Sequence, residues 1–268
     1  MSNELEQNPI TLEELKAAVE AKQFCLWYQP KLSCETLMLK GFEALVRWDH
    51  PERGLLQPSR FISLAEEGGL IGAITEQVVD QAFKWYKATS GVQGLTLSIN
   101  FSARRLSDLD FADWLQRMCR AAAIRTDDVI LEISETAVLD AKLLALDMFT
   151  RLRTKGFRVA IDDFGIGQSS LGLLAKLPFS EVKIDKSFGM TAATSEDSRA
   201  FIKSTVNLSH SLGLTVVGEG VEDRQTFDYL RQVGCDFAHG FFISPPMPPD
   251  QALDWILNRR QRTKHILI

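Results

Sequence analysis

Residues that can bind a metal ion or move a proton recur along this chain of 268 residues, each at or near the end of a short apolar segment. They are Glu43, Asn100, Glu132, Asp162, Asp163, Lys183, Glu219 and His239. If the apolar segments are the strands of a parallel sheet, their carboxyl ends meet at one edge or at one barrel mouth. Five carboxylates around one opening repel each other, so the pattern predicts that cations bind among them.

Carboxylate and amide oxygens favour Mg²⁺ or Mn²⁺ over zinc. Two such ions that share a carboxylate can activate water and stabilise in-line displacement at phosphorus, so a two-metal phosphodiesterase is our leading interpretation. Lys183 could orient the attacking water or offset developing negative charge. Each acid also has a structural interpretation, because Glu43 could pair with Arg47, and Glu132 with Glu135 could flank a strand end. A barrel enzyme that enolises its substrate with a lysine base and Mg²⁺ is a further alternative, although the sequence offers no dedicated site for a substrate carboxylate.

Charge and cysteine use argue against several other classes of protein. The net charge of −5 and the pI near 5.5 argue against a broad basic surface that binds nucleic-acid polymers. The four cysteines form no C-x-x-C pair, which removes the common zinc and redox motifs and suits a reducing compartment. The N-terminus lacks the regions of a signal peptide, and no apolar run reaches the roughly 18 residues of a membrane span. We therefore expect a cytoplasmic protein without a direct membrane span.

Apolar periodicity predicts strands that alternate with helices. The expected strands span residues 24–29, 38–48, 95–101, 129–133, 157–161, 181–184, 214–217 and 236–243. The expected helices span residues 76–88, 111–122, 143–155, 199–212 and 225–233. Thr11 and Glu14 have the spacing of a capping box, which predicts that a further helix begins after Thr11.

Eight strands with helices between most of them indicate one α/β domain, most simply a modified TIM (β/α)8 barrel. The connection between the first two strands is too short for a helical crossover, which predicts an antiparallel first strand. An open doubly wound sheet is the alternative. We expect an N-terminal helical segment over 1–22, the barrel domain over 23–258 and a basic C-terminal tail over 259–268.

Asp162 and Asp163 are adjacent, although neighbouring side chains on a strand point to opposite faces. Both can serve one site only if the chain changes direction there. We expect Asp162 to end the strand and Asp163 to begin a turn that Gly165 and Gly167 allow.

Several ordered motifs resemble the EAL domain family, the cyclic di-GMP phosphodiesterases. The segment Glu43-Ala44-Leu45-Val46-Arg47 is similar to the E-A-L-x-R signature of that family. The resemblance runs from Tyr28-Gln29-Pro30 to Pro246 and includes Ile99-Asn100-Phe101-Ser102, Leu131-Glu132-Ile133-Ser134-Glu135, Ile161-Asp162-Asp163-Phe164-Gly165, Val182-Lys183-Ile184-Asp185 and Glu219-Gly220-Val221-Glu222.

The resemblance implies a two-metal hydrolysis of cyclic di-GMP to linear pGpG with two Mg²⁺ or Mn²⁺ ions. It also implies roles for individual residues. The catalytic residues would be Lys183, Glu219 and Glu43, with Lys183 holding the hydrolytic water. The metal ligands would be Glu43, Asn100, Glu132, Asp162 as the bridge, Asp163 and Glu219. The substrate contacts would be Gln29, Leu45, Arg47, Glu222 and His239, and Glu135 would stabilise the loop after Asp163. A homodimer and an upstream sensor or signalling domain are implied as partners.

The chain departs from the family pattern at a few positions. His239-Gly240-Phe241 stands where Gln-Gly-Tyr is usual, Ile166 and Gln168 alter the loop after the paired aspartates, and Pro245 replaces a common basic residue. A histidine side chain can donate or accept one hydrogen bond, but it cannot reproduce both the donor and the acceptor of the glutamine amide. These departures leave two alternatives open: a weak or inactive domain that acts as a cyclic di-GMP receptor and signals to a partner, or a protein-interaction module with no ligand.

Overall fold

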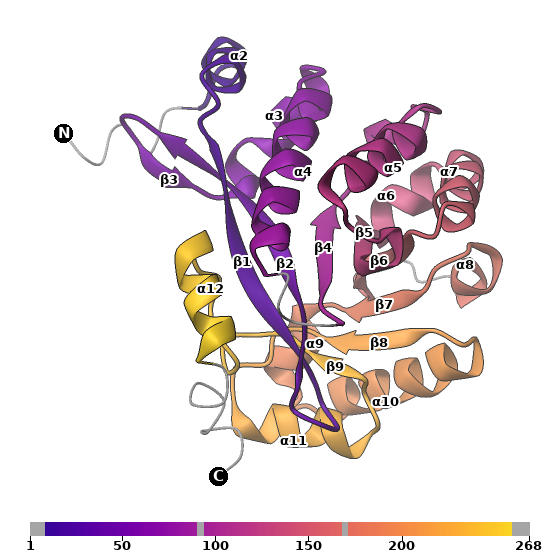
Figure 1. Ribbon diagram of the computed structural model, residues 1–268. Coiled ribbons are helices and arrows are strands. Elements are labelled where there is room, and N and C mark those ends of the chain that lie inside the picture. Colours follow the sequence, from indigo (N-terminus) through magenta and orange to yellow (C-terminus); the bar gives the residue numbers. More distant parts are fainter. Residues whose placement is uncertain (1–8, 90–93, 168–170, 259–268) are drawn as a thin grey trace.

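The computed structural model describes residues 9–89, 94–167 and 171–258, and within them eight strands close into a barrel (Figure 1). These strands are β1 (Phe24–Ser33), β2 (Leu39–His50), β4 (Thr96–Asn100), β5 (Val129–Ser134), β6 (Arg158–Phe164), β7 (Glu181–Ile184), β8 (Thr215–Gly218) and β9 (Phe237–Ala238). Their order around the barrel is β1-β9-β8-β7-β6-β5-β4-β2, and pairing of β1 with β2 closes it. The predicted closed barrel is confirmed, and the open sheet is wrong.

Strand β1 runs antiparallel to both of its neighbours, β2 and β9. The other neighbouring pairs in the barrel, from β2 through β9, are parallel. This confirms the predicted antiparallel first strand. The structure adds a short strand that the sequence did not predict, β3 (Gly54–Leu56), which pairs with the far end of β2 outside the barrel.

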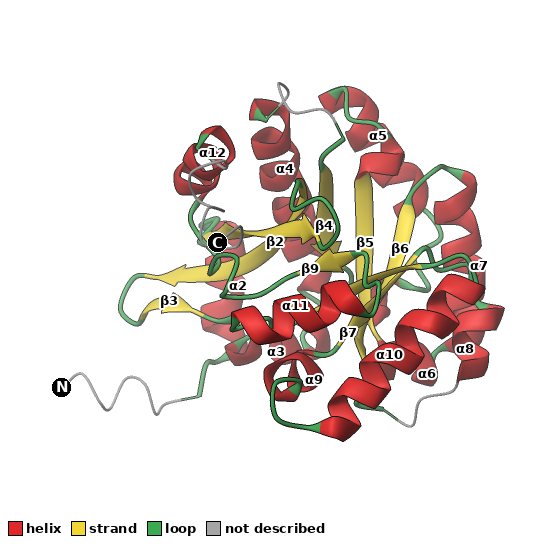
Figure 2. Cartoon of the chain, turned by 90° about the horizontal axis from the view of Figure 1, so that it is seen from below, coloured by secondary structure: helices red, strands yellow, loops and turns green. Residues whose placement is uncertain are grey.

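Helices lie around the outside of the barrel strands (Figure 2). Six of those described match the predicted helices within a few residues at each end: α2 (Leu12–Glu20), α4 (Ile71–Ala88), α5 (Phe111–Ala122), α7 (Lys142–Thr154), α10 (Glu196–Ser211) and α11 (Arg224–Gln232). Five further helices have no counterpart among the predicted ranges: α3 (Ile62–Glu67), α6 (Glu135–Asp140), α8 (Leu171–Lys176), α9 (Lys186–Thr191) and α12 (Pro249–Leu257). The first four have six residues each, too few turns for an apolar period to be recognised, whereas α12 is as long as α11 and was missed for no such reason.

The N-terminal helix α2 begins as its capping box predicts. The Thr11 side chain accepts from the Glu14 backbone N–H at 3.2 Å, and the Glu14 carboxylate accepts from the Thr11 N–H at 2.7 Å. Leu15 and Ala18 on its inner face are fully buried in the same core as the barrel strands. The predicted basic tail, 259–268, lies outside the described residues, and the predicted domain boundaries stay predictions.

Parallel strands are covered on both faces, which explains the apolar runs in the sequence. In β5, for example, Val129, Ile130, Leu131 and Ile133 are all buried. A polar side chain inside such a barrel therefore needs a partner or a ligand. No helix in the described part of the chain is long and apolar enough to cross a membrane.

Candidate active site

Lys183 on β7 lies at the centre of a buried cluster of carboxylates. Its side chain is only 2% exposed. Its Nζ atom lies 2.7 Å from Glu132 Oε2, 2.9 Å from Glu219 Oε1, 3.1 Å from Glu43 Oε2 and 3.2 Å from Asp162 Oδ1. The structure thus brings together acids from β2, β5, β6 and the segment after β8, and the sequence pattern predicts this convergence.

The register of neighbouring strands sets the positions of the first three ligand candidates. Asn100 on β4 pairs with Glu132 on β5, and the Asn100 amide donates to Glu43 Oε1 on β2 at 3.0 Å. Both Glu43 and Glu132 are more than nine-tenths buried. Because these strands are parallel neighbours, their side chains meet at one level of the barrel.

The adjacent acids Asp162 and Asp163 reach the same site through a bulge within β6. The strand continues through Phe164, so our expectation that it ends at Asp162 is wrong. Its register with β7 shifts between Ile161 and Phe164, and Asp163 has a φ of 54°, in the left-handed region. A bulge of this kind redirects a side chain without ending the strand. One oxygen of each aspartate lies within 4.8 Å of the other and of a Glu219 oxygen.

Glu219 follows β8 and owes its position to a close approach of helix α9. A Cβ atom added to Gly189 would lie 1.8 Å from the Glu219 carbonyl oxygen, so only glycine allows α9 to pack there. The Glu219 backbone N–H also donates to the Ile184 carbonyl at 3.3 Å. The Glu219 backbone is therefore held against the end of β7.

The carboxylates of the cluster outnumber its cations, and their pKa values reflect this. Burial, reinforced by the Glu43 carboxylate, raises the pKa of Glu132 to about 7. Burial raises the pKa of Asp162 well above its usual value, in spite of Lys183. Burial opposes ionisation of Glu219 as well, but Lys183 and His239 together outweigh it and lower the Glu219 pKa to about 2. Burial would lower the pKa of Lys183, yet the four carboxylates hold it well above its usual value.

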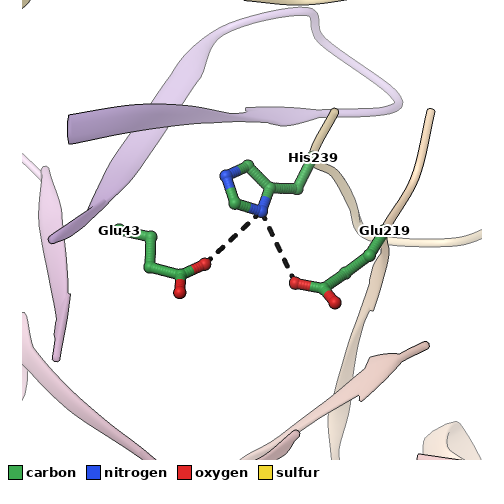
Figure 3. A group of neighbouring side chains, drawn as sticks. All are labelled: Glu43, Glu219 and His239. Carbon is green, nitrogen blue, oxygen red and sulfur yellow. Dashed lines mark ion pairs between the residues drawn. The ribbon is translucent and has the colours of Figure 1, made fainter. Parts of the chain in front are cut away.

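This donor set fits divalent cations. Two groups of ligand atoms lie close enough together to hold an ion, and they share Asp162: Glu43 with Glu132 and Asp162, and Asp162 with Asp163 and Glu219. A third group joins Glu43 and Glu219 to His239 (Figure 3). One lysine cannot neutralise so many acids, whereas hard cations would.

The predicted substrate contacts occupy different environments. Gln29 on β1 pairs with Glu43 in register, and its amide donates to the Ser244 carbonyl at 2.9 Å. Leu45 lines the cavity described below. Arg47 is buried and donates to the Val46 carbonyl at 2.8 Å, whereas Glu222 is exposed in the segment after β8.

Glu135 contacts the loop after the paired aspartates, as the resemblance implies. Its Oε2 atom accepts from the backbone N–H groups of Gly165 and Gly167 at 3.0 and 3.3 Å. Ile166, between these glycines, is 62% exposed. Gln168 lies outside the described residues.

A cavity of about 620 Å³ opens beside the carboxylates. One of its walls was not predicted from the sequence. This wall consists of the 3₁₀ turn Pro58–Arg60, α3 and α4, with the apolar residues Pro58, Ile62, Ile71, Ile74 and Val78. In α4 these residues recur at three- and four-residue spacing, which is the pattern of an ordinary core helix. The sequence therefore contained no signal that separates them from the core. The volume lies within the range of small-molecule sites.

A model of the EAL domain family matches residues 12–246. The chain belongs to the EAL domain family. It is 36% identical over 247 residues to the bifunctional diguanylate cyclase/cyclic di-GMP phosphodiesterase MucR of Pseudomonas aeruginosa, covering 90% of this chain and 36% of MucR. It is 33% identical over 234 residues to the cyclic di-GMP phosphodiesterase RocR of the same organism, covering 87% of this chain and 60% of RocR.

Solved structures of EAL proteins share the fold. The structure of the PaMucR phosphodiesterase in complex with c-di-GMP superimposes with a TM-score of 0.84 at 34% identity, covering 90% of this chain and 98% of that one. The chain spans about a third of the length of the full MucR protein. The likeness to the curated relatives is therefore a likeness to their EAL portions.

Proposed function

We propose that this chain is a metal-dependent phosphodiesterase that hydrolyses cyclic di-GMP to linear pGpG. The observation that carries the proposal is the convergence of four carboxylates on Lys183 beside a cavity large enough for a small ligand. EAL proteins named as cyclic di-GMP phosphodiesterases match nearly the whole chain, which supports the substrate. Family membership leaves little reason to keep the enolising enzyme as an alternative.

The residues of the cluster would hold two Mg²⁺ or Mn²⁺ ions. Glu43, Asn100, Glu132 and Asp162 would bind one ion, and Asp162, Asp163 and Glu219 the other, with Asp162 shared. When bound, such ions activate water and stabilise the charge that develops on phosphate oxygens. The lowered pKa values of Glu43 and Glu219 keep both groups ionised at neutral pH, which suits ligands of a cation.

Lys183 contributes as a hydrogen-bond donor and as a fixed positive charge. Its raised pKa keeps the ammonium group protonated, so it does not accept a proton from water at neutral pH. Its N–H groups can orient the attacking water and stabilise negative charge at the reacting phosphate. The buried carboxylates around it restrict its side chain to this position.

Gln29, Leu45, Arg47 and Glu222 would contact the dinucleotide. Glu135 would act through the loop 165–167, since its carboxylate binds two backbone N–H groups immediately after Asp163. Releasing that carboxylate would loosen the bulge that directs Asp163 toward the site. A homodimer and an upstream sensor domain stay predictions.

Product analysis tests the proposal directly. The protein is incubated with cyclic di-GMP and Mg²⁺ or Mn²⁺, and pGpG is quantified by chromatography. Asp162→Asn should reduce kcat by at least about 100-fold, because it removes a charged ligand from the reacting site. Asp147→Asn is the matched control, since Asp147 is an exposed partner of Arg151 on α7, outside the barrel.

The outcomes separate the proposal from its alternatives. Formation of pGpG that requires metal and depends on Asp162 supports it. Tight binding of the dinucleotide without any product at high enzyme concentration overturns it in favour of a receptor. Absence of both binding and product would favour a protein-interaction module.

A further inference from the structure

His239 lies directly after β9, where the backbone fixes it beside β8. Its N–H donates to the Gly218 carbonyl at 2.9 Å, and its carbonyl accepts from the Val221 N–H at 3.2 Å. The two bonds join His239 to Gly218 and Val221, the residues on either side of the Glu219–Gly220 segment. The imidazole ring is therefore positioned by main-chain contacts on both sides of a candidate metal ligand.

The ring points its Nδ1 atom between two carboxylates, as Figure 3 shows. Nδ1 lies 3.6 Å from Glu43 Oε2 and 3.5 Å from Glu219 Oε1. Both separations exceed the range of about 2.7–3.2 Å expected for a good N–H···O hydrogen bond. His239 is only 6% exposed, and its Nε2 has no hydrogen-bond partner among the described residues. Nδ1, and not this Nε2 atom, is the ring nitrogen that faces the two carboxylates.

The same separations lie close to the edge length of a tetrahedral coordination shell and are longer than that of an octahedral one. With metal–ligand distances of about 2.1 Å, neighbouring ligand atoms lie about 3.0 Å apart in octahedral geometry and about 3.4 Å apart in tetrahedral geometry. The three atoms form one of the ligand groups of the site, all within 4.8 Å of one another. We propose that His239 is a metal ligand in this chain, with Nδ1 binding a divalent ion together with Glu43 and Glu219.

This inference rests on the proposed function, because Glu43 and Glu219, assigned above to one ion each, would also hold the ion at His239. It replaces the expectation that His239 contacts the substrate in the manner of a glutamine. An imidazole donor favours ions such as Mn²⁺, Co²⁺ and Zn²⁺ relative to Mg²⁺, which prefers oxygen ligands. The chain should therefore discriminate between these ions more strongly than an otherwise equal site built from oxygen alone.

Pulsed electron paramagnetic resonance on the Mn²⁺-loaded protein tests the ligand itself, without reference to turnover. Bound Mn²⁺ should show modulation from a directly coordinated ¹⁴N nucleus. Protein labelled with ¹⁵N-histidine should shift the modulation frequencies, which identifies the donor as histidine without any mutation. His239→Gln should abolish the modulation, whereas His210→Gln should retain it, since His210 lies on α10 and pairs with Asp236.

Binding titrations give a second measurement on the same variants. His239→Gln should weaken Mn²⁺ binding by about tenfold or more and change Mg²⁺ binding by less than about threefold. Bound Mn²⁺ without histidine nitrogen modulation would overturn the inference and leave the proposed function intact. Absence of any bound Mn²⁺ or Mg²⁺ would overturn both. If His239→Gln weakened the binding of Mn²⁺ and Mg²⁺ equally, His239 would position the carboxylate ligands and would not itself bind the ion.

Discussion

Two buried ionic clusters lie one above the other inside the barrel, and β7 contributes to both. Glu181 begins β7, and Lys183 follows two residues later on the same face, about 7 Å further along the strand. Glu181 binds two cations: its Oε1 lies 2.6 Å from Lys31 Nζ, and its Oε2 lies 3.6 Å from Arg158 Nη2. Lys183 instead binds four carboxylates. We call these groups the base cluster and the mouth cluster.

The two clusters differ in charge balance. In the base cluster, two cations, Lys31 and Arg158, surround the single carboxylate of Glu181. The Thr215 hydroxyl also donates to this carboxylate at 3.4 Å. In the mouth cluster, one ammonium group cannot balance its carboxylates, and burial raises the pKa of Glu132 and Asp162. A buried ion pair that is satisfied by its own partners can serve structure alone. An excess of buried carboxylates calls for a further cation, so burial by itself does not distinguish a functional cluster, whereas the sign of its excess charge does.

Replacement of the mouth lysine should have the largest effect. Lys183→Met keeps a long apolar stem but removes the charge and the N–H donors that face the reacting site. We expect kcat with saturating Mg²⁺ to fall by about 1,000-fold, or about 4 kcal/mol of transition-state stabilisation. Thermal unfolding of the metal-loaded variant should still be cooperative. A fall of less than tenfold in a folded variant would contradict the assigned role of Lys183.

Substitution in the base cluster should lower the stability of the fold and leave turnover nearly unchanged. Glu181→Gln leaves Lys31 and Arg158 without their carboxylate, and breaking a buried pair in this way costs about 3 kcal/mol in the free energy of unfolding. Urea unfolding measures that loss. Because Glu181 lies about 7 Å from the mouth along β7, kcat should stay within about twofold of the wild type. A tenfold loss of kcat with unchanged stability would show that both clusters belong to one functional unit.

The polar residues at strand ends could be predicted from the sequence because strands produce a strong apolar signal and end at recognisable positions. Glu43, Glu132 and Glu219 could be grouped on that basis before any distance was known. Their contacts with Lys183 could not be predicted from the strand pattern, because these contacts depend on closure of the barrel between β1 and β2. The base cluster was not predicted either, because Lys31 and Glu181 look like ordinary charged residues near strand ends.

The paired aspartates show where local sequence information ends. The need for a change of direction at Asp163 followed from strand geometry. The sequence suggested a turn after the strand, whereas the structure contains a bulge inside it, with Asp163 in the left-handed region. Choosing between the two requires the register with β7, which is set by tertiary pairing and not by the residues of β6 themselves.

The smallest effect concerns metal binding and pH, to which the mouth cluster should respond and the base cluster should not. With metal removed by EDTA, the folded protein binds a proton at Glu132 up to about pH 7, whereas the unfolded chain releases it near 4.5. The metal-free fold should therefore lose stability as pH rises between these values. Mg²⁺ at 100 times its Kd should add about 2.7 kcal/mol to the free energy of unfolding at pH 8, where Glu132 is ionised.

Below pH 7 a proton competes with the ion at Glu132, so the stabilisation by Mg²⁺ should shrink by about 1.4 kcal/mol for each pH unit. Urea unfolding at pH 6, 7 and 8, with EDTA or with Mg²⁺, measures this dependence. Glu132→Gln removes the titrating group and should flatten the pH dependence, whereas Asp147→Asn should not change it. An increment from Mg²⁺ that is equal at pH 6 and pH 8 would mean that the ion does not bind at Glu132, and that the charge imbalance of the mouth cluster is relieved by Lys183 alone.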